Sequence, residues 1–263
     1  MNRLIDDGER HLLNKVPEVT IFFWLIKVLA TTVGETAADY LNFNLHFGLT
    51  GTSMLMSALL AIFLIVQIRA REYVPWLYWL VVVLISIVGP LISDNLVDNL
   101  GVSLETTTLG FSLALLATFV SWYAVERSLS IHTIVTTRRE IFYWATILFT
   151  FALGTAAGDL IAEGMNLGYS KSALLFGGLI VVTALAYYLF KVNPIAAFWI
   201  AYILTRPLGA SCGDLLSQPL ANGGFGLGTT VTSSLFLAAI AGLVVYLSFV
   251  RRTVAALGAK LRD

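Results

Sequence analysis

The chain has 263 residues, of which 58% are hydrophobic and only 12% are charged, and its 16 basic side chains balance 16 acidic ones. With a mean hydropathy of +0.84, this composition excludes a soluble globular domain and indicates a multi-pass membrane protein. The single cysteine, Cys212, excludes disulfides and thiolate metal clusters within one chain.

Eight apolar runs follow one another along the chain, each about 18 or more residues long with few charges. An α-helix of that length crosses a hydrocarbon core about 30 Å thick. We therefore predict an all-α integral membrane protein with eight transmembrane helices. The predicted spans are residues 18–40, 52–69, 75–95, 106–124, 141–161, 172–190, 195–216 and 230–249.

Polar segments divide this series into two halves of four spans each. Residues 1–17 form a polar segment at the membrane surface and do not resemble a cleaved signal peptide. Residues 18–125 and 141–250 hold the spans, residues 126–140 are a charged linker, and residues 251–263 are a tail.

Basic residues are concentrated at both chain ends and in every second loop. By the positive-inside rule, this distribution places both termini and the 126–140 linker in the cytoplasm. The other loops carry only Lys171. The residues that set the predicted orientation are Arg3, Arg10, Lys15, Arg69, Arg71, Arg127, Arg138, Arg139, Lys191, Arg251, Arg252, Lys260 and Arg262.

A skeleton of tryptophan, glycine and aspartate occurs four times, on alternate spans. The glycine stands ten residues after the tryptophan and the aspartate five residues later. Such self-similarity indicates one two-helix unit copied four times. Because each unit holds two spans, all four have the same orientation and are parallel repeats. The skeleton residues are Trp24, Gly34 and Asp39; Trp79, Gly89 and Asp94; Trp144, Gly154 and Asp159; and Trp199, Gly209 and Asp214.

Small residues surround each glycine except in the second repeat. Surfaces of this kind let membrane helices approach closely, so the first helices of the repeats should pack around an axis with the second helices outside. Tryptophan and glycine are interpreted as packing residues. Pro90 and Pro207 should kink two first helices and free the carbonyls of Ser86 and Ile203.

Ionisable side chains within the first helices are the candidate functional residues. Glu35, Asp39, Asp94, Asp159 and Asp214 are candidate ion ligands, including ligands of a metal ion, and Lys27 and Arg206 are candidate counter-charges. A carboxylate inside a membrane protein needs a partner, a proton or an ion. Two structural alternatives stay open: an ion-pair network between helices, and aspartates that bond backbone groups at the helix ends.

Two strings of the sequence, KVPEVTIFFWLIKVLATTVGETAADYL and FWIAYILTRPLGASCGDLL, resemble a bacterial family of integral membrane proteins built from four tandem repeats of unknown function. The resemblance covers residues 17–249. It implies two spans per repeat with a marked tryptophan, and a location in the bacterial cytoplasmic (inner) membrane. It implies no particular activity.

We predict a secondary exporter or carrier of a small cation, coupled to protons. Oxygen ligands without membrane histidines favour a hard divalent ion such as Mn²⁺ or Mg²⁺ as substrate, and no other cofactor is expected. The alternatives are a non-transporting scaffold and a carrier of an organic ion that uses Arg206. An enzyme is not expected, because the three histidines lie in tails or loops and no P-loop occurs. The expected partners are the lipid bilayer and the ion, not nucleic acid, and a homo-oligomer stays open.

Overall fold

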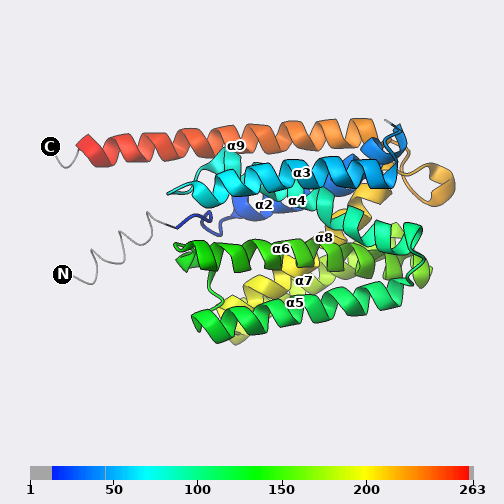
Figure 1. Cartoon of the computed structure of the whole chain (residues 1–263), viewed down its shortest axis with the longest axis horizontal. Coiled ribbons are helices and arrows are strands. Elements are labelled where there is room, and N and C mark those ends of the chain that lie inside the picture. Colours follow the sequence, from blue (N-terminus) through cyan, green and yellow to red (C-terminus); the bar gives the residue numbers. More distant parts are fainter. Residues whose placement is uncertain (1–13, 45, 261–263) are drawn as a thin grey trace.

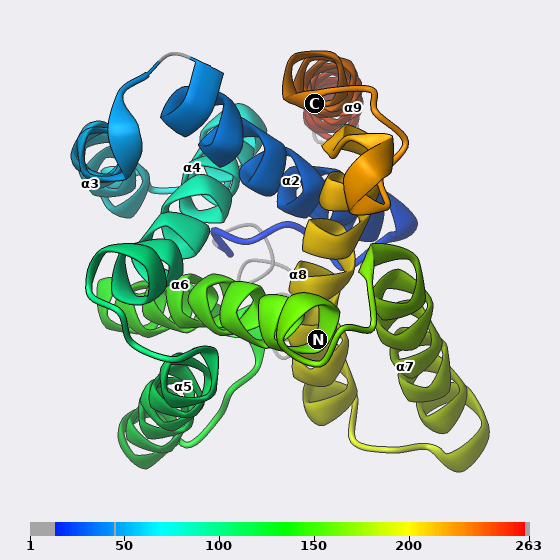
Figure 2. The same ribbon diagram turned by 90° about the vertical axis from the view of Figure 1, so that its right-hand side faces the viewer.

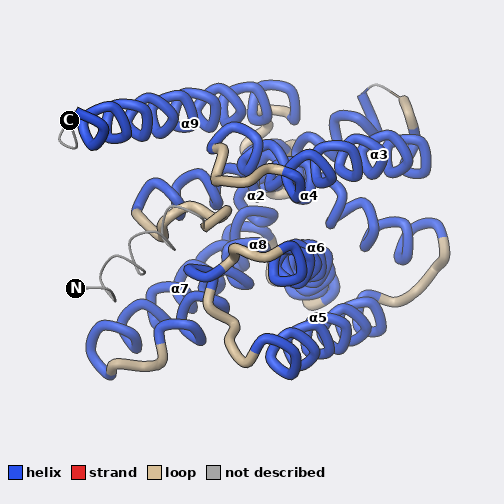
Figure 3. The backbone as a smooth tube through the Cα atoms, turned by 60° about the vertical axis from the view of Figure 1, so that its left-hand side comes forward, coloured by secondary structure: helices blue, strands red, loops and turns tan. Residues whose placement is uncertain are grey.

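The computed structural model describes residues 14–44 and 46–260. That part of the chain consists of helices and their connections, without β-strands (Figure 3). Eight of the described helices are long and apolar enough to cross a membrane, which confirms the predicted fold class. They are α2 (Ile21–Asp39), α3 (Gly48–Arg69), α4 (Pro75–Asp94), α5 (Leu104–Glu126), α6 (Thr137–Asp159), α7 (Tyr169–Phe190), α8 (Pro194–Ser217) and α9 (Thr229–Lys260).

Short helical segments of other types join these helices. Three π-helical turns directly continue first helices: η1 (Tyr40–Asn44), η2 (Asn95–Asn99) and η4 (Leu160–Gly164). Two 3₁₀ turns, η3 (Ile131–Thr133) and η5 (Leu220–Asn222), lie in loops. The π-helical turns were not foreseen, since their residues continue the apolar pattern of the preceding helix.

Local sequence explains where several of the long helices begin. Thr20 and Thr136 cap α2 and α6, because each hydroxyl oxygen accepts a hydrogen bond from the backbone N–H three residues later. Asn193 caps α8 in the same way and is followed by Pro194, which suits the first turn of a helix.

The first helices of the four repeats form a closed ring at the centre of the molecule. Each of α2, α4 and α6 packs against the next first helix, and α8 returns to α2 (Figure 2). Within their apolar windows these helices are 50–67% buried, against 6–17% for α3, α5, α7 and α9. The second helices therefore form the outer layer that faces lipid, as the sequence predicts.

Each outer helix packs chiefly against a neighbouring repeat and not against its own. Helix α3 packs on α4, α5 on α6, α7 on α8, and α9 closes the circle on α2 (Figure 1). The four repeats thus interlock. Across the boundary between the two predicted halves, α5 packs on α6 and α9 packs on α2.

Glycines set the distance between neighbouring helices of the ring. A Cβ on Gly34 would overlap the carbonyl oxygen of Ser86, the group that Pro90 frees from the helical ladder of α4. The other skeleton glycines face the equivalent residue of the next repeat: Gly89 faces Phe151, Gly154 faces Arg206, and Gly209 faces Thr31. The same contact therefore occurs four times around the ring, including the closing step.

At the other end of the ring, pairs of aromatic side chains make a second contact that occurs four times between neighbouring repeats. Each skeleton tryptophan meets the aromatic residue that precedes the tryptophan of the previous repeat. The ring centroids are 5.7 Å apart for Phe23 and Trp79, 5.4 Å for Tyr78 and Trp144, 6.3 Å for Tyr143 and Trp199, and 5.6 Å for Phe198 and Trp24. The skeleton tryptophans and glycines thus lie in the contacts between neighbouring repeats.

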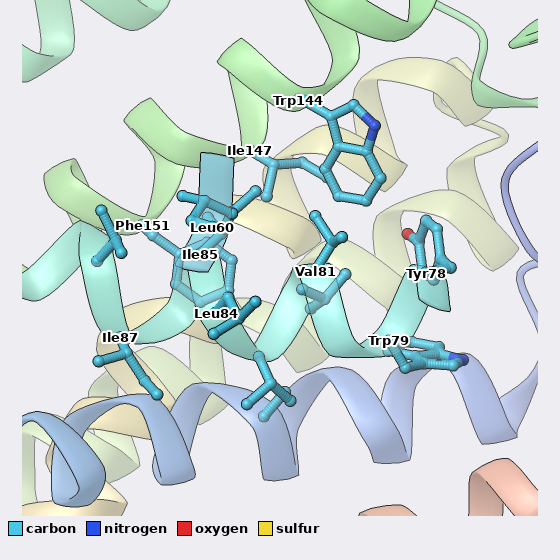
Figure 4. Close-up of a cluster of buried hydrophobic side chains, with 14 of the residues drawn as sticks. Leu60, Tyr78, Trp79, Val81, Leu84, Ile85, Ile87, Trp144, Ile147 and Phe151 are labelled. Carbon is cyan, nitrogen blue, oxygen red and sulfur yellow. The ribbon is translucent and has the colours of Figure 1, made fainter. Parts of the chain in front are cut away.

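Helix α4 is the most deeply buried helix of the ring, because it has core contacts on both sides. Its side chains meet Trp144, Ile147 and Phe151 of α6 on one side and approach α2 near Trp79 on the other (Figure 4). This continuous apolar core holds the helices that carry the charged residues.

Candidate ion-binding axis

The four repeat aspartates lie at one end of the ring. Asp39, Asp94 and Asp159 are the last residues of α2, α4 and α6, and Asp214 lies in the last turn of α8. All four side chains are partly exposed. The constant position of the aspartate in each repeat, combined with the closed ring, is what brings the four carboxyl groups to the same level.

The carboxyl groups of the four aspartates interact electrostatically but form no hydrogen bonds or ion pairs among the described residues. Asp94, Asp159 and Asp214 each lie within the electrostatic field of Glu35 and Asp39, and Glu35 acts on Asp39 as well. Among the described residues, no hydrogen bond or ion pair involves the carboxyl group of any of the four. A group of like carboxyl groups without donors is unfavourable unless protons or cations neutralise it.

No direct metal site is assembled from these acids. In the described part of the chain, no three His, Cys, Asp or Glu side chains are grouped so that they could hold one metal ion. Glu35, Asp39, Asp94, Asp159 and Asp214 therefore do not converge on one point in this structure, and their role as ion ligands stays a prediction. The carboxyl groups interact electrostatically but are not arranged around one metal ion.

Two further acids belong to the same end of the ring and were missed from the sequence. Glu163 acts electrostatically on Asp39, Asp159 and Asp214, and Asp98 acts on Asp94. Each stands four residues after the aspartate of its own repeat. A search for acids one helical turn beyond the skeleton could have found both.

Below the aspartates, buried side chains recur every four residues on each ring helix, and the contacts of Lys27 and Arg206 with other ring helices place this register inside the ring. We call this register the axial column. All its members are buried except Glu35, which is partly exposed. It has three layers: Glu35, Pro90, Thr155 and Ala210; then Thr31, Ser86, Phe151 and Arg206; then Lys27, Val82, Ile147 and Tyr202.

Arg206 joins three of the four ring helices within this column. Its side chain is fully buried, and its Nη2 lies 2.6 Å from Oε2 of Glu35. It also donates from Nη2 to Thr155 Oγ1 at 2.9 Å and from Nη1 to the carbonyl oxygen of Thr31 at 2.8 Å. Arg206 thus pairs with an acid on a neighbouring helix, and its role as a counter-charge in transport stays a prediction.

Within the described part of the chain, Lys27 has no such acidic partner. Its Nζ is buried without a hydrogen bond and lies 4.1 Å from the ring centroid of Phe151 and 4.2 Å from that of Tyr202. A cation over aromatic faces is stabilised by the ring quadrupole, though less than by a carboxylate. The predicted pairing of Lys27 with an acid is therefore not formed, since the acids lie in layers nearer the aspartates.

An aromatic layer lies at the opposite end of the axial column. The hydroxyl groups of Tyr78 and Tyr143 share a hydrogen bond of 2.5 Å, and Phe23 packs against Trp79 and Tyr202. Beyond this layer, Glu140 is 1% exposed and bonded to Lys15, an ion pair that sequence reasoning missed because both residues belong to segments expected at the membrane surface.

These features define a class of protein: an all-α, eight-span membrane protein in which four parallel helix pairs form a ring around a charged axis. The chain belongs to the family described as Repeat of Unknown Function (DUF347), which matches it four times, at residues 22–73, 77–128, 142–193 and 197–253. Comparison with curated proteins and with solved structures gives no match.

Proposed function

We propose that the protein is a carrier of a small cation, with protons as coupling ion, that moves its substrate along the axial column. The observation that carries this proposal is the set of four partly exposed repeat aspartates at one end of a closed ring, whose carboxyl groups make no hydrogen bond or ion pair among the described residues. Membrane proteins keep such carboxyl groups, despite their cost, where an ion or proton uses them.

The order of charges along the axis supports a cation. An incoming ion first meets the aspartates with Glu163 and Asp98, and only then Glu35 one turn deeper. Like-signed groups at a mouth raise the local concentration of counter-ions. Arg206 would compete with the arriving cation for Glu35, so cation entry and guanidinium movement would be linked.

The distribution of basic residues supports an orientation with the aspartates outside. The helix ends opposite the aspartates carry basic residues at or next to them: Arg69, Arg127, Arg138 and Lys191. The positive-inside rule then assigns that end to the cytoplasm of a bacterial cell, and the aspartates to the outer face of the cytoplasmic membrane.

The test is cation flux into proteoliposomes, with Mn²⁺, Mg²⁺, Na⁺ and an organic cation as substrates and with and without a pH gradient. We expect Asp39→Asn and Asp159→Asn to fold normally and to lose flux roughly tenfold or more, since a contact to a charged group contributes roughly 1.5–3 kcal/mol. The matched control is Glu105→Gln, an exposed acid at the same end, which should leave flux unchanged.

The scaffold alternative makes the opposite prediction. If the aspartates only hold the helix ends together, the asparagine variants lose stability and expression together, and the wild type moves no cation. A wild-type protein without flux of any tested cation, acid-dependent or not, would remove the transport proposal.

A further inference from the structure

A short segment before α2 crosses the end of the ring opposite the aspartates. Residues 14–16, which we call the strap, are all buried, although they precede the first span. The strap leads from α2 to the start of α6, the helix on the far side of the ring (Figure 2). It therefore lies beneath the axial column and not beside it.

Specific bonds hold the strap to the linker between the two halves. The backbone N–H of Lys15 donates to the carbonyl oxygen of Ile134 at 3.1 Å, and the N–H of Ile134 donates to Asn14 Oδ1 at 3.1 Å. Val16 joins the same apolar core as Ile131 and Ile134. The strap is thus built into the fold.

An ion pair locks the strap to the ring. Lys15 Nζ lies 2.7 Å from Glu140 Oε2 and donates to the carbonyl oxygen of Ile68, the last but one residue of α3, at 2.9 Å. Glu140 Oε1 accepts from Gln67 Nε2 at 3.2 Å and from the indole N–H of Trp144 at 3.4 Å. Every oxygen of this buried carboxylate is therefore occupied.

The chemistry of this lock differs from that of the surrounding core. A buried ion pair contributes little net stability, because desolvation offsets the attraction, whereas apolar packing of the same area would be strongly favourable. Water that replaces a withdrawn strap solvates both charges, so the pair can open without leaving an uncompensated charge in the core.

We propose that the strap is the inner gate of the protein: residues 14–16 seal the axial column at the end opposite the aspartates and withdraw when the Lys15–Glu140 pair opens. This inference rests on the proposed function, because a gate needs a pathway. The structure then corresponds to the state that is closed at the strap.

A labelling experiment tests the seal without reference to any substrate. Val82→Cys, in a full-length chain carrying Cys212→Ser, places one thiol in the axial column, and a small membrane-impermeant thiol reagent is added on the side of the strap. The lock is removed by Lys15→Met with Glu140→Gln, so that no buried charge is left unpaired. We expect labelling to become faster by roughly tenfold or more. Labelling that is equally fast with and without the lock would overturn the proposal.

A cross-link tests the gate. Lys15→Cys with Glu140→Cys, in the same Cys212→Ser chain, is joined by a short reducible bis-thiol reagent. We expect the linked protein to lose cation flux and to recover it on reduction. The control pair is Glu126→Cys with Arg138→Cys, at an ion pair in which Arg138 is 68% exposed and which does not include the strap; linking it should leave flux unchanged.

The outcomes separate the two proposals. Full flux through the protein linked at the strap would overturn the gate. A wild type that moves no cation would overturn the proposed function, and the labelling of Val82→Cys would still decide whether the strap seals the column.

Discussion

At the scale of single residues, the Arg206–Glu35 pair is the contact on which both the structural and the functional interpretation of the axis depend. The guanidinium is completely buried and still bonds three groups on two neighbouring helices. Such a pair adds little net stability, but removing one partner leaves an uncompensated charge inside the ring.

We therefore expect Arg206→Met and Glu35→Gln each to lower the free energy of unfolding by about 3–5 kcal/mol, and the double variant to recover most of that loss. Thermal unfolding of the purified proteins gives the double-mutant cycle. Lys27→Met is the matched control, because this equally buried cation has only ring contacts and should cost at most about 2 kcal/mol. Additive losses for Arg206 and Glu35 would mean that the pair does not act as a unit.

The sequence predicts which axial residues are charged, but not which of them meet. Lys27 and Arg206 each stand eight residues before an acid of their own helix, too far for contact along one helix. Partners therefore come from other helices, and their identity depends on the order of helices around the ring. The buried pair of Lys15 and Glu140 was missed for the same reason, since its members are 125 residues apart.

At the scale of the helices, close approach is set by the glycines. Gly34 is the clearest position, because a methyl group there would meet backbone, the Ser86 carbonyl, which cannot move aside as a flexible side chain could. The Ser86 carbonyl that Pro90 frees therefore lies against the backbone of Gly34. One repeat supplies the carbonyl, and its neighbour supplies the space for it.

Gly34→Ala should lower the free energy of unfolding by about 1–3 kcal/mol, the usual cost of overpacking a well-packed core. Gly110→Ala, within α5, is the matched control: nothing lies within 4 Å of the added methyl group, and alanine favours a helix. Thermal stability in detergent measures both. Equal effects at the two positions would show that α2 and α4 are not in close contact.

The helices themselves were predicted well, because an apolar run and a repeated skeleton are local signals. Their ends were predicted less well: α6 begins at Thr137, and three first helices pass into π-helical turns after the aspartate. Such turns depend on how the chain leaves the ring and have no strong signature in sequence.

At the scale of the whole molecule, parallel repeats with the same contact at every step must close into a ring or continue as a spiral. Here four steps close it, as the contacts of Gly209 with Thr31 and of Phe198 with Trp24 show. The sequence predicts four inner and four outer helices. It does not predict that each outer helix packs on the first helix of a neighbouring repeat, which only the structure shows.

That packing predicts how the protein behaves when it is cut in the linker. Residues 1–128 and 129–263, expressed separately, should each be unstable, because α5 would lose α6, α9 would lose α2, and the polar side chains of the axial column would face lipid. Expressed together, they should assemble and purify as one complex, since the ring contacts between the halves stay intact. The measurement is recovery of both fragments through a tag on only one of them, with each fragment alone as control. Two monodisperse halves that fold independently would contradict a closed ring and, with it, a continuous axis for an ion.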